Sequence, residues 1–250
     1  MGRPRAHAGT DDPAIGVARR LSKLGVCSRS EAERRVASGR VRVDGRVVLN
    51  PETPTRSRTQ IELDDVPVTG MTRVYLMLNK PRGLVTTAQD ERGRDTIYRC
   101  LDGHALPWVA PVGRLDKASE GLLLLSNDPE WAARLSDPAF AVHKTYHVQI
   151  DGHPDSTALA ALLEGVEDDG ELLRAKSARP LRAGTRSSWI EIVLCQGRNR
   201  QIRRMLARLG FPVRRLIRVS IGPIELGELA KGQFRALDSA ELAALATIRR

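Results

Sequence analysis

The chain has few aromatic side chains, few cysteines and no long apolar run. Phe, Trp and Tyr make up 4% of its 250 residues, so aliphatic side chains must build most of the core. Cys27, Cys100 and Cys195 are odd in number and far apart, which argues against a disulfide framework or a zinc ribbon. No apolar segment approaches the length that spans a bilayer, and residues 1–13 lack the apolar stretch of a signal peptide. We therefore expect a cytoplasmic protein without membrane attachment, in which residues 1–13 form a flexible tail.

Sequence motifs for a nucleotide cofactor or a metal are also missing. No glycine-rich phosphate-binding motif follows a predicted strand. His143 and His147 are four residues apart along a predicted strand, but no third ligand accompanies them. The sequence predicts neither a cofactor nor a metal site.

Positive charge is the strongest feature of the composition. The chain carries 40 Lys and Arg against 30 Asp and Glu, a formal net charge of +10. Such a balance favours a polyanionic partner, although solubility or an arginine-rich coding bias also produces it. The distribution of the charge must decide between these explanations.

Residues 14–70 predict a small basic domain. Apolar residues recur at helical spacing over residues 17–25, and Ser28 with Glu31 forms a capping-box pattern that begins a second helix ending at Gly39. Asp44 and Gly45 then suit a tight hairpin turn, and residues 61–63 predict a further strand. A solvated helix face is the alternative explanation for the cations on this domain. These cations are Arg19, Arg20, Lys23, Arg29, Arg34, Arg35 and Arg40.

Residues 71–250 predict a larger domain of mixed helices and strands, with the boundary near Gly70. Apolar runs at residues 74–78, 121–125, 145–150 and 189–194 predict strands, and helices are predicted after Asp128 and over residues 157–164. No internal repeat is visible. The pattern favours an α+β fold with a mixed, mainly antiparallel sheet.

Asp116 is the most informative candidate for chemistry. It lies between the glycine-bounded turn at Gly113 and the apolar run at residues 121–125, so a rigid strand would hold its loop. From position alone, a turn aspartate that accepts backbone hydrogen bonds is the favoured explanation.

Two further side chains are predicted to face the interior. Residues 201–209 predict a helix in which Arg203 lies at the edge of the apolar face, and a half-buried guanidinium needs an acidic partner. A structural ion pair would satisfy it as well as a catalytic one. Tyr146 shares a strand face with Val148 and Ile150, where it would ordinarily be a core aromatic.

Several blocks of sequence resemble known families. LSKLGVCSRSEAERRVASGRVRVDGRVV (residues 21–48) is similar to the S4 RNA-binding domain, which implies that the seven cations named above meet RNA phosphates. YLMLNKPRG (75–83), GRLDKASEGLLLLSND (113–128), KTYHV (144–148) and GRNRQIRRM (197–205) resemble, in order and spacing, the RsuA-type pseudouridine synthases of ribosomal RNA. Ser119 and Gln196 depart from the usual Thr and Glu of that family.

The resemblance implies roles for individual residues. Asp116 matches the catalytic aspartate, Arg203 the arginine that holds it charged and oriented, and Tyr146 the tyrosine that lies against the target base. Arg114 and Leu115 are expected to help fill the gap left by the flipped nucleotide. The implied reaction converts uridine to pseudouridine in ribosomal RNA, more in keeping with 23S than 16S, by a protein expected to be a monomer.

Two other functions remain open from the sequence. A non-catalytic RNA-binding or ribosome-assembly factor would use the same basic surface with Asp116 dispensable. A nucleosidase would use Asp116 and Glu120 as paired acid and base and would release free uracil.

Overall fold

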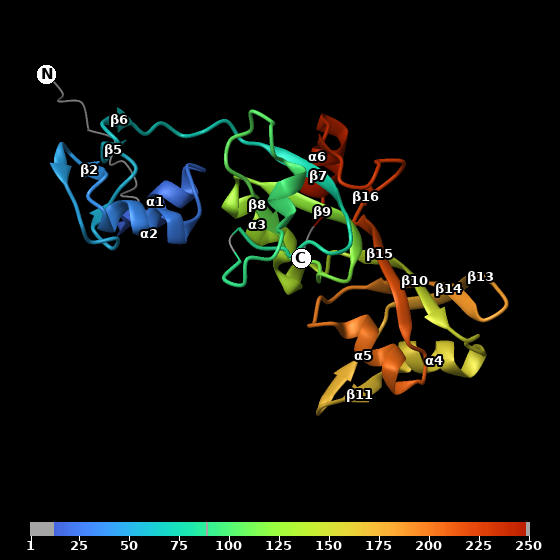
Figure 1. Ribbon diagram of the computed structural model, residues 1–250. Coiled ribbons are helices and arrows are strands. Elements are labelled where there is room, and N and C mark those ends of the chain that lie inside the picture. Colours follow the sequence, from blue (N-terminus) through green and yellow to red (C-terminus); the bar gives the residue numbers. More distant parts are fainter. Residues whose placement is uncertain (1–12, 89, 249–250) are drawn as a thin grey trace, which may run out of the picture. The chain divides into compact units, whose positions relative to one another are not determined.

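A computed structural model describes residues 13–88 and 90–248, and the chain divides into two units between Arg73 and Val74 (Figure 1). The tail predicted for residues 1–13 lies, apart from Pro13, outside the described residues. In the described ranges no helix combines the length and the apolar character needed to cross a membrane.

Short helices and small sheets form the unit Met1–Arg73. Helix α1 (Val17–Lys23) precedes α2 (Arg29–Ala37), and the Ser28 side chain caps α2 by accepting a hydrogen bond from the Glu31 amide at 3.1 Å. The Glu31 carboxylate does not complete the predicted capping box, because the guanidinium groups of Arg34 and Arg35 bind it. The α1 and α2 faces that meet are aliphatic, as the helical spacing predicts.

The strands of this unit follow the predicted hairpin. Asp44 and Gly45 both have positive φ, at 48° and 77°, as a type I′ turn requires. The sheet has the order β3-β2-β5-β6, and β1 pairs with β4 apart from it. The strands are β1 (Ile15–Gly16), β2 (Val41–Val43), β3 (Arg46–Val47), β4 (Pro54–Thr55), β5 (Ile61–Leu63) and β6 (Val66–Pro67).

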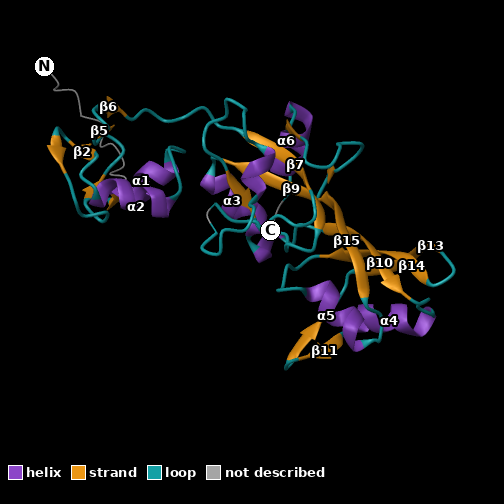
Figure 2. Ribbon diagram, viewed as in Figure 1, coloured by secondary structure: helices purple, strands orange, loops and turns teal. Residues whose placement is uncertain are grey.

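A long, mainly antiparallel sheet dominates the unit Val74–Arg250 (Figure 2). Its order is β13-β14-β10-β15-β9-β7-β17, with β16 paired to β15 and β8 to β9. The strands of this unit are β7 (Tyr75–Lys80), β8 (Ala110–Val112), β9 (Glu120–Ser126), β10 (Lys144–Asp151), β13 (Ser177–Ala183), β14 (Ser187–Leu194), β15 (Val213–Ile221), β16 (Ile224–Glu225) and β17 (Phe234–Ala236), and the separate hairpin β11 (Val166–Asp168) and β12 (Glu171–Leu173).

Strand β9 is apolar at every position from Leu122 to Leu125 because both of its faces are covered. Leu123 and Leu125 join one buried cluster, whereas Leu122 and Leu124 join another on the opposite face. Helices α4 (Ser156–Glu164) and α5 (Gln201–Arg208) lie at the β10–β14 end, while α3 (Pro129–Ser136) and α6 (Ser239–Ala246) lie at the β7–β9 end (Figure 1). Short 3-10 turns, η1 (Ile97–Cys100) and η2 (Pro138–Phe140), complete the unit.

Strands β9 and β15 are parallel, unlike their neighbours in the sheet, and they meet at Gly121 and Arg218. Gly121 has φ +100°, and a Cβ added there would lie 2.3 Å from the carbonyl oxygen of Arg218. Only glycine allows this approach. The parallel junction therefore depends on Gly121, directly after the loop that carries Asp116.

Candidate active site

Asp116 lies on the loop of residues 113–119, which joins β8 to β9. Gly113 enters the loop with φ +73°, and the Ser119 amide donates to the carbonyl oxygen of Asp116 at 2.9 Å. The Asp116 side chain stays 36% exposed. The loop is thus a closed turn that presents one carboxylate while a buried strand fixes its far end.

Lys80, at the end of β7, binds the main chain of this loop. Its side chain is fully buried, and Nζ donates to the carbonyl oxygens of Pro81 at 3.1 Å, Asp116 at 3.2 Å and Ser119 at 2.9 Å. Burial lowers the pKa of Lys80 to about 8. The nearby Asp116 charge acts in the opposite direction but does not outweigh burial. On the other side of the loop, the Thr86 hydroxyl donates to the Leu115 carbonyl oxygen at 2.7 Å. The main chain around Asp116 is therefore held from two sides.

The guanidinium that lies within ion-pair distance of the Asp116 carboxylate belongs to Arg200, which the sequence did not single out. Nη1 of Arg200 lies 3.6 Å from Oδ2 of Asp116. Arg203 does turn inward from α5, but it donates to the carbonyl oxygens of Ala118 at 3.0 Å and Val213 at 3.1 Å. Carbonyl oxygens thus take the place of the acidic partner that the sequence predicted for Arg203.

Arg203 nevertheless lies within the electrostatic field of the site. Burial and the nearby Arg200 charge lower the pKa of Arg203, whereas Asp116 opposes that shift. Because Arg203 holds Ala118, two residues along from Asp116, it fixes the loop and contributes positive charge at the same time.

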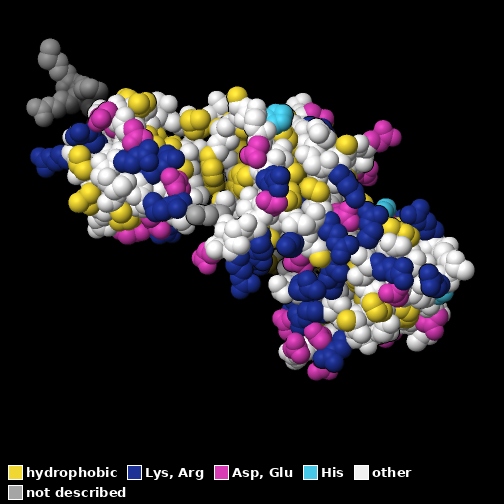
Figure 3. Space-filling model, viewed as in Figure 1, with side chains coloured by type: hydrophobic (Ala, Val, Ile, Leu, Met, Phe, Trp, Pro, Cys, Tyr) yellow, Lys and Arg dark blue, Asp and Glu magenta, His cyan; other side chains and the backbone are white. Residues whose placement is uncertain are grey.

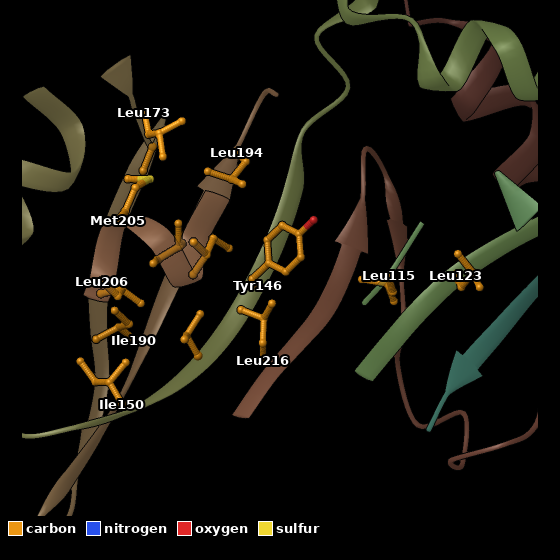
Figure 4. Packing of buried hydrophobic residues seen from close by; sticks show 14 of the residues in the cluster. Leu115, Leu123, Tyr146, Ile150, Leu173, Ile190, Leu194, Met205, Leu206 and Leu216 are labelled. Atoms are coloured by element: carbon orange, nitrogen blue, oxygen red, sulfur yellow. The ribbon is translucent and has the colours of Figure 1, made fainter. Parts of the chain in front are cut away.

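A cavity of about 540 Å³ opens beside Asp116. The structure brings the predicted site residues of this unit to one space, since the cavity lining includes Asp116, Arg114, Leu115, Tyr146 and Arg203, and it adds Arg200. Tyr146 is 7% exposed and lies at the edge of the apolar cluster, on the side that faces Leu115 (Figure 4). Its ring can therefore serve as an apolar wall of the cavity.

Arg114 and Leu115 differ in how they are presented. Arg114 is exposed and its side chain has no partner in residues 13–88 and 90–248, while Leu115 is 6% exposed and belongs to the apolar cluster. Only Arg114 of the two reaches the surface where an RNA strand could meet it.

The cavity residues of β15 and of the start of β10 were not predicted from the sequence. Arg218 is 3% exposed, its Nε donates to the Leu122 carbonyl oxygen at 2.7 Å, and its Nη2 is buried without a partner. Lys144 lines the same wall, with Nζ donating to the Val142 carbonyl oxygen at 3.1 Å. The alternation of Leu216 and Arg218 with their neighbours was the available signal for a strand at this position.

Glu120 is placed where it cannot act with Asp116. Its side chain is 3% exposed, and Arg215 binds it at 3.0 Å and Lys231 at 2.6 Å. Glu120 does not line the cavity. Within the described chain, no group of three or more His, Cys, Asp and Glu side chains is placed to hold a metal ion.

The cations predicted to bind RNA are distributed over α1, α2 and the start of β2, and many already have acidic partners. Arg29 binds Glu33 at 3.0 Å, Arg40 binds Asp64 at 2.7 and 2.6 Å, and Arg20 donates to the Thr55 carbonyl oxygen at 3.2 Å. Arg19 is exposed and has no such partner among the described residues. Arg34 and Arg35 share Glu31, as described above, and Lys23 ends α1.

Comparison with known proteins identifies the two units. Residues 74–208 match the family described as RNA pseudouridylate synthase, and residues 18–61 match the S4 domain. A protein of Rickettsia prowazekii, named "Uncharacterized RNA pseudouridine synthase", is 35% identical over 89% of this chain and 94% of its own length. A protein of the same name from Mycobacterium tuberculosis is 41% identical over 90% of each chain.

A solved structure supports the same assignment. The crystal structure of a pseudouridylate synthase is 29% identical, covers 92% of this chain and 99% of its own, and superposes with a TM-score of 0.66. The predicted α+β fold, S4 domain and isomerase activity are confirmed by these matches. This chain belongs to the RNA pseudouridine synthase family and carries an S4 domain ahead of its catalytic unit.

Proposed function

We propose that this RNA pseudouridine synthase acts on one uridine of ribosomal RNA, in the 23S molecule, with Asp116 as its catalytic carboxylate. The observation that carries the proposal is the carboxylate of Asp116 on a fixed loop, 36% exposed, beside a cavity lined by Tyr146 and Arg203. The form of the segment GRNRQIRRM, residues 197–205, favours the 23S over the 16S molecule.

Charge supports a structured RNA as the substrate. The chain has a formal net charge of +10, and Figure 3 shows Lys and Arg side chains gathered over the region of β15 and α5 on one face of the catalytic unit. An S4 domain with further cations precedes that unit. Positive surfaces on both units suit a large folded RNA, whose phosphates they would meet largely without regard to sequence.

The reaction can proceed with one carboxylate because nothing is lost from the nucleoside. The bond between ribose C1′ and uracil N1 breaks with the help of Asp116, uracil turns inside the cavity, and its C5 bonds to C1′. The C5 proton then leaves and N1 takes up a proton, so the product is an isomer. A hydrolase would need a second carboxylate to activate water. Asp137, the other acidic residue among the described ones that line the cavity, accepts a hydrogen bond from the Ala139 amide at 2.9 Å, and the buried Glu120 is bound by Arg215 and Lys231.

Binding requires the target uridine to leave its stack. The Tyr146 ring offers an apolar wall on which the flipped base can stack, and such stacking offsets part of the cost of extrusion. Arg114 would enter the gap in the RNA, which its exposure and its lack of a partner among the described residues support. Arg200, 3.6 Å from the carboxylate, holds the Asp116 side chain in place beside the cavity.

Tritium release tests this proposal. The substrates are 23S and 16S ribosomal RNA transcripts of the source organism that carry tritium at C5 of uridine. Tritium release is compared between wild type, Asp116→Asn and Asp102→Asn, a control at an exposed residue. We expect release from 23S RNA with wild type and Asp102→Asn and none with Asp116→Asn. Equal release with Asp116→Asn would contradict the role of Asp116, and release from 16S RNA alone would change the target.

The same assay separates the two other functions. A non-catalytic assembly factor would bind the transcripts without tritium release from any variant. A nucleosidase would form free uracil, which chromatography detects, and would leave the RNA with an abasic ribose.

A further inference from the structure

One row of residues runs in register across the middle of the sheet. Lys80 on β7 pairs with Gly121 on β9, Gly121 with Arg218 on β15, Arg218 with Tyr146 on β10, and Tyr146 with Ile192 on β14. Neighbours in register project to the same face of a sheet. Arg218 is therefore the direct cross-strand neighbour of Tyr146, and both line the Asp116 cavity.

The guanidinium of Arg218 makes few hydrogen bonds within the described part of the chain. Only its Nε makes a hydrogen bond, to the Leu122 carbonyl oxygen, and Nη2 is buried without a partner among the described residues. The side chain is 3% exposed. An unmatched charge at such a depth is costly, and proteins normally pair it.

No carboxylate compensates this charge in the described part of the chain. The acidic residues that line the cavity are Asp116, which faces Arg200 at 3.6 Å, and Asp137, which accepts a hydrogen bond from the Ala139 amide at 2.9 Å. Lys144 adds a second cation to the same wall, and burial together with the Arg218 charge lowers the pKa of Lys144. Part of the cavity wall thus has uncompensated positive charge, which favours a ligand atom that is or becomes negative.

The depth of Arg218 decides which part of the RNA it meets. A flipped nucleotide enters its pocket with the base first, and its phosphates stay at the entrance. The cations at the entrance are exposed, since the Arg200 side chain is 50% exposed and Arg114 also lies at the surface. Arg218, at 3%, lies far deeper. Its position suits the base and not the backbone.

We infer that Arg218 binds a carbonyl oxygen of the flipped uracil and stabilises the negative charge that the base acquires when its glycosidic bond breaks. The inference rests on the proposed role of the Asp116 cavity. The electron pair of the C1′–N1 bond passes to N1 and spreads onto O2 and O4, where guanidinium N–H groups donate. When C5 bonds to C1′, the C5 proton leaves, N1 gains a proton and the charge on the base disappears. Lys144 strengthens the positive potential from the same wall.

A substrate with a better leaving group tests this role. Fluorine at C5 makes the departing uracil a weaker base, so its release depends less on a stabilising cation. Full-length wild type and Arg218→Gln are compared in single turnovers on 23S transcripts made with uridine or with 5-fluorouridine, and C-glycoside formation is followed by mass spectrometry. The C-glycoside of 5-fluorouracil keeps fluorine at C5, where no proton can leave, and takes up water across its N1=C6 bond instead. We expect Arg218→Gln to slow the uridine reaction by about 100-fold, because the loss of one hydrogen-bond donor to a developing anion has an effect of this size. The 5-fluorouridine reaction should slow by only about tenfold.

Matched variants separate this role from a structural one. Arg186→Gln, on the exposed turn between β13 and β14, removes the same charge and should leave both rates unchanged. Arg218→Lys keeps the charge and should restore part of the uridine rate. Equal slowing on the two substrates would overturn the inference, because a distorted fold would not distinguish leaving groups.

Lys144→Met provides the same comparison if Arg218→Gln does not fold. It should slow the uridine reaction more than the 5-fluorouridine reaction, by a smaller factor than Arg218→Gln, and equal slowing would again overturn the inference. Failure of the proposed function is recognised separately, because wild type would then form no C-glycoside on 23S RNA containing uridine.

Discussion

The buried ammonium group of Lys80 holds the main chain of Asp116, with Nζ 3.2 Å from the Asp116 carbonyl oxygen. The same group also binds the carbonyl oxygens of Pro81 and Ser119. The loop that presents the carboxylate is thereby tied to the end of β7, at a residue 36 positions earlier in the chain. A charged donor in this position fixes geometry at the cost of burying a charge.

Replacement of Lys80 by methionine should destabilise the catalytic unit and disturb the loop. Lys80→Met keeps most of the side-chain volume but leaves three carbonyl oxygens, buried or half-buried, without their donor. We expect the free energy of unfolding to fall by roughly 2–4 kcal/mol, measured by urea denaturation. Lys117→Met, on the exposed part of the same loop, is the control and should change it by less than about 0.5 kcal/mol. A stable Lys80→Met protein would show that the three hydrogen bonds contribute little.

The contribution of Lys80 should also depend on pH. Burial lowers the pKa of Lys80 to about 8 in the folded state, while an unfolded lysine has a pKa of about 10.4. Between these values the unfolded chain binds more protons than the folded one, so stability rises with pH. The difference in the free energy of unfolding between wild type and Lys80→Met should grow from pH 8 to pH 10. A difference that stays constant or shrinks would contradict a lowered pKa of Lys80 in the folded protein.

A methyl group at Gly121 should be far more damaging than one at another glycine with positive φ. The added Cβ would lie 2.3 Å from the Arg218 carbonyl oxygen, so β9 and β15 would have to separate. Gly170 has φ +74° with nothing within 4 Å of the added Cβ, which makes Gly170→Ala a control for backbone strain alone. We expect about 1–2 kcal/mol of destabilisation for Gly170→Ala and more than about 3 kcal/mol for Gly121→Ala, by urea denaturation. Similar losses would mean that the strands move apart at little cost.

Helices and hairpins that begin or end at a capping or turn residue could be predicted from the local sequence. Asp128 caps α3, Gly165 ends α4, and Asp44 with Gly45 turns the first hairpin, each through a preference of that residue type. Strand β9 was evident because four consecutive leucines are buried on both faces. The setting of Asp116, between a turn and this strand, could be inferred from the same signals.

The central strand β15 was missed, because its arginines hide the apolar pattern. Arg215 and Arg218 are buried or half-buried through contacts with Glu120, Trp189 and Leu122, which lie far away in the sequence. Such pairing depends on sheet order, which local patterns do not determine. Arg200, which forms an ion pair with Asp116, was missed for a related reason. Arg200 lies in a left-handed turn, with φ 48°, just outside the helix on which the prediction was made.

Glu120→Gln should lower the free energy of unfolding, while pseudouridine should remain the product. Burial raises the pKa of Glu120, but hydrogen bonds from Arg215 and Lys231 outweigh it and lower the pKa overall. Removal of this carboxylate leaves two cations without their partner, but Arg215 and Lys231 are 36% and 59% exposed, so the loss should be only about 1–2 kcal/mol. Because the folded pKa is lowered, the wild type should lose this contribution as the pH falls through the acid range, and the variant should lose less there. We expect Glu120→Gln to form pseudouridine without free uracil, whereas release of uracil that depends on Glu120 in the wild type would revive a paired-carboxylate mechanism.

The S4 domain should determine much of the salt dependence of RNA binding. Removal of one cation that binds a phosphate flattens the logarithmic dependence of affinity on salt concentration by about 0.7–0.9. Arg19 is exposed without a partner among the described residues, so Arg19→Gln should reduce the slope by about that amount in filter binding to 23S RNA. Arg40 is already bound by both oxygens of Asp64 and must give up that pair to meet a phosphate, so Arg40→Gln should reduce it less. Deletion of residues 1–70 should flatten the slope further than either substitution while the catalytic unit keeps its melting temperature. An unchanged slope after the deletion would show that this domain does not bind RNA phosphates.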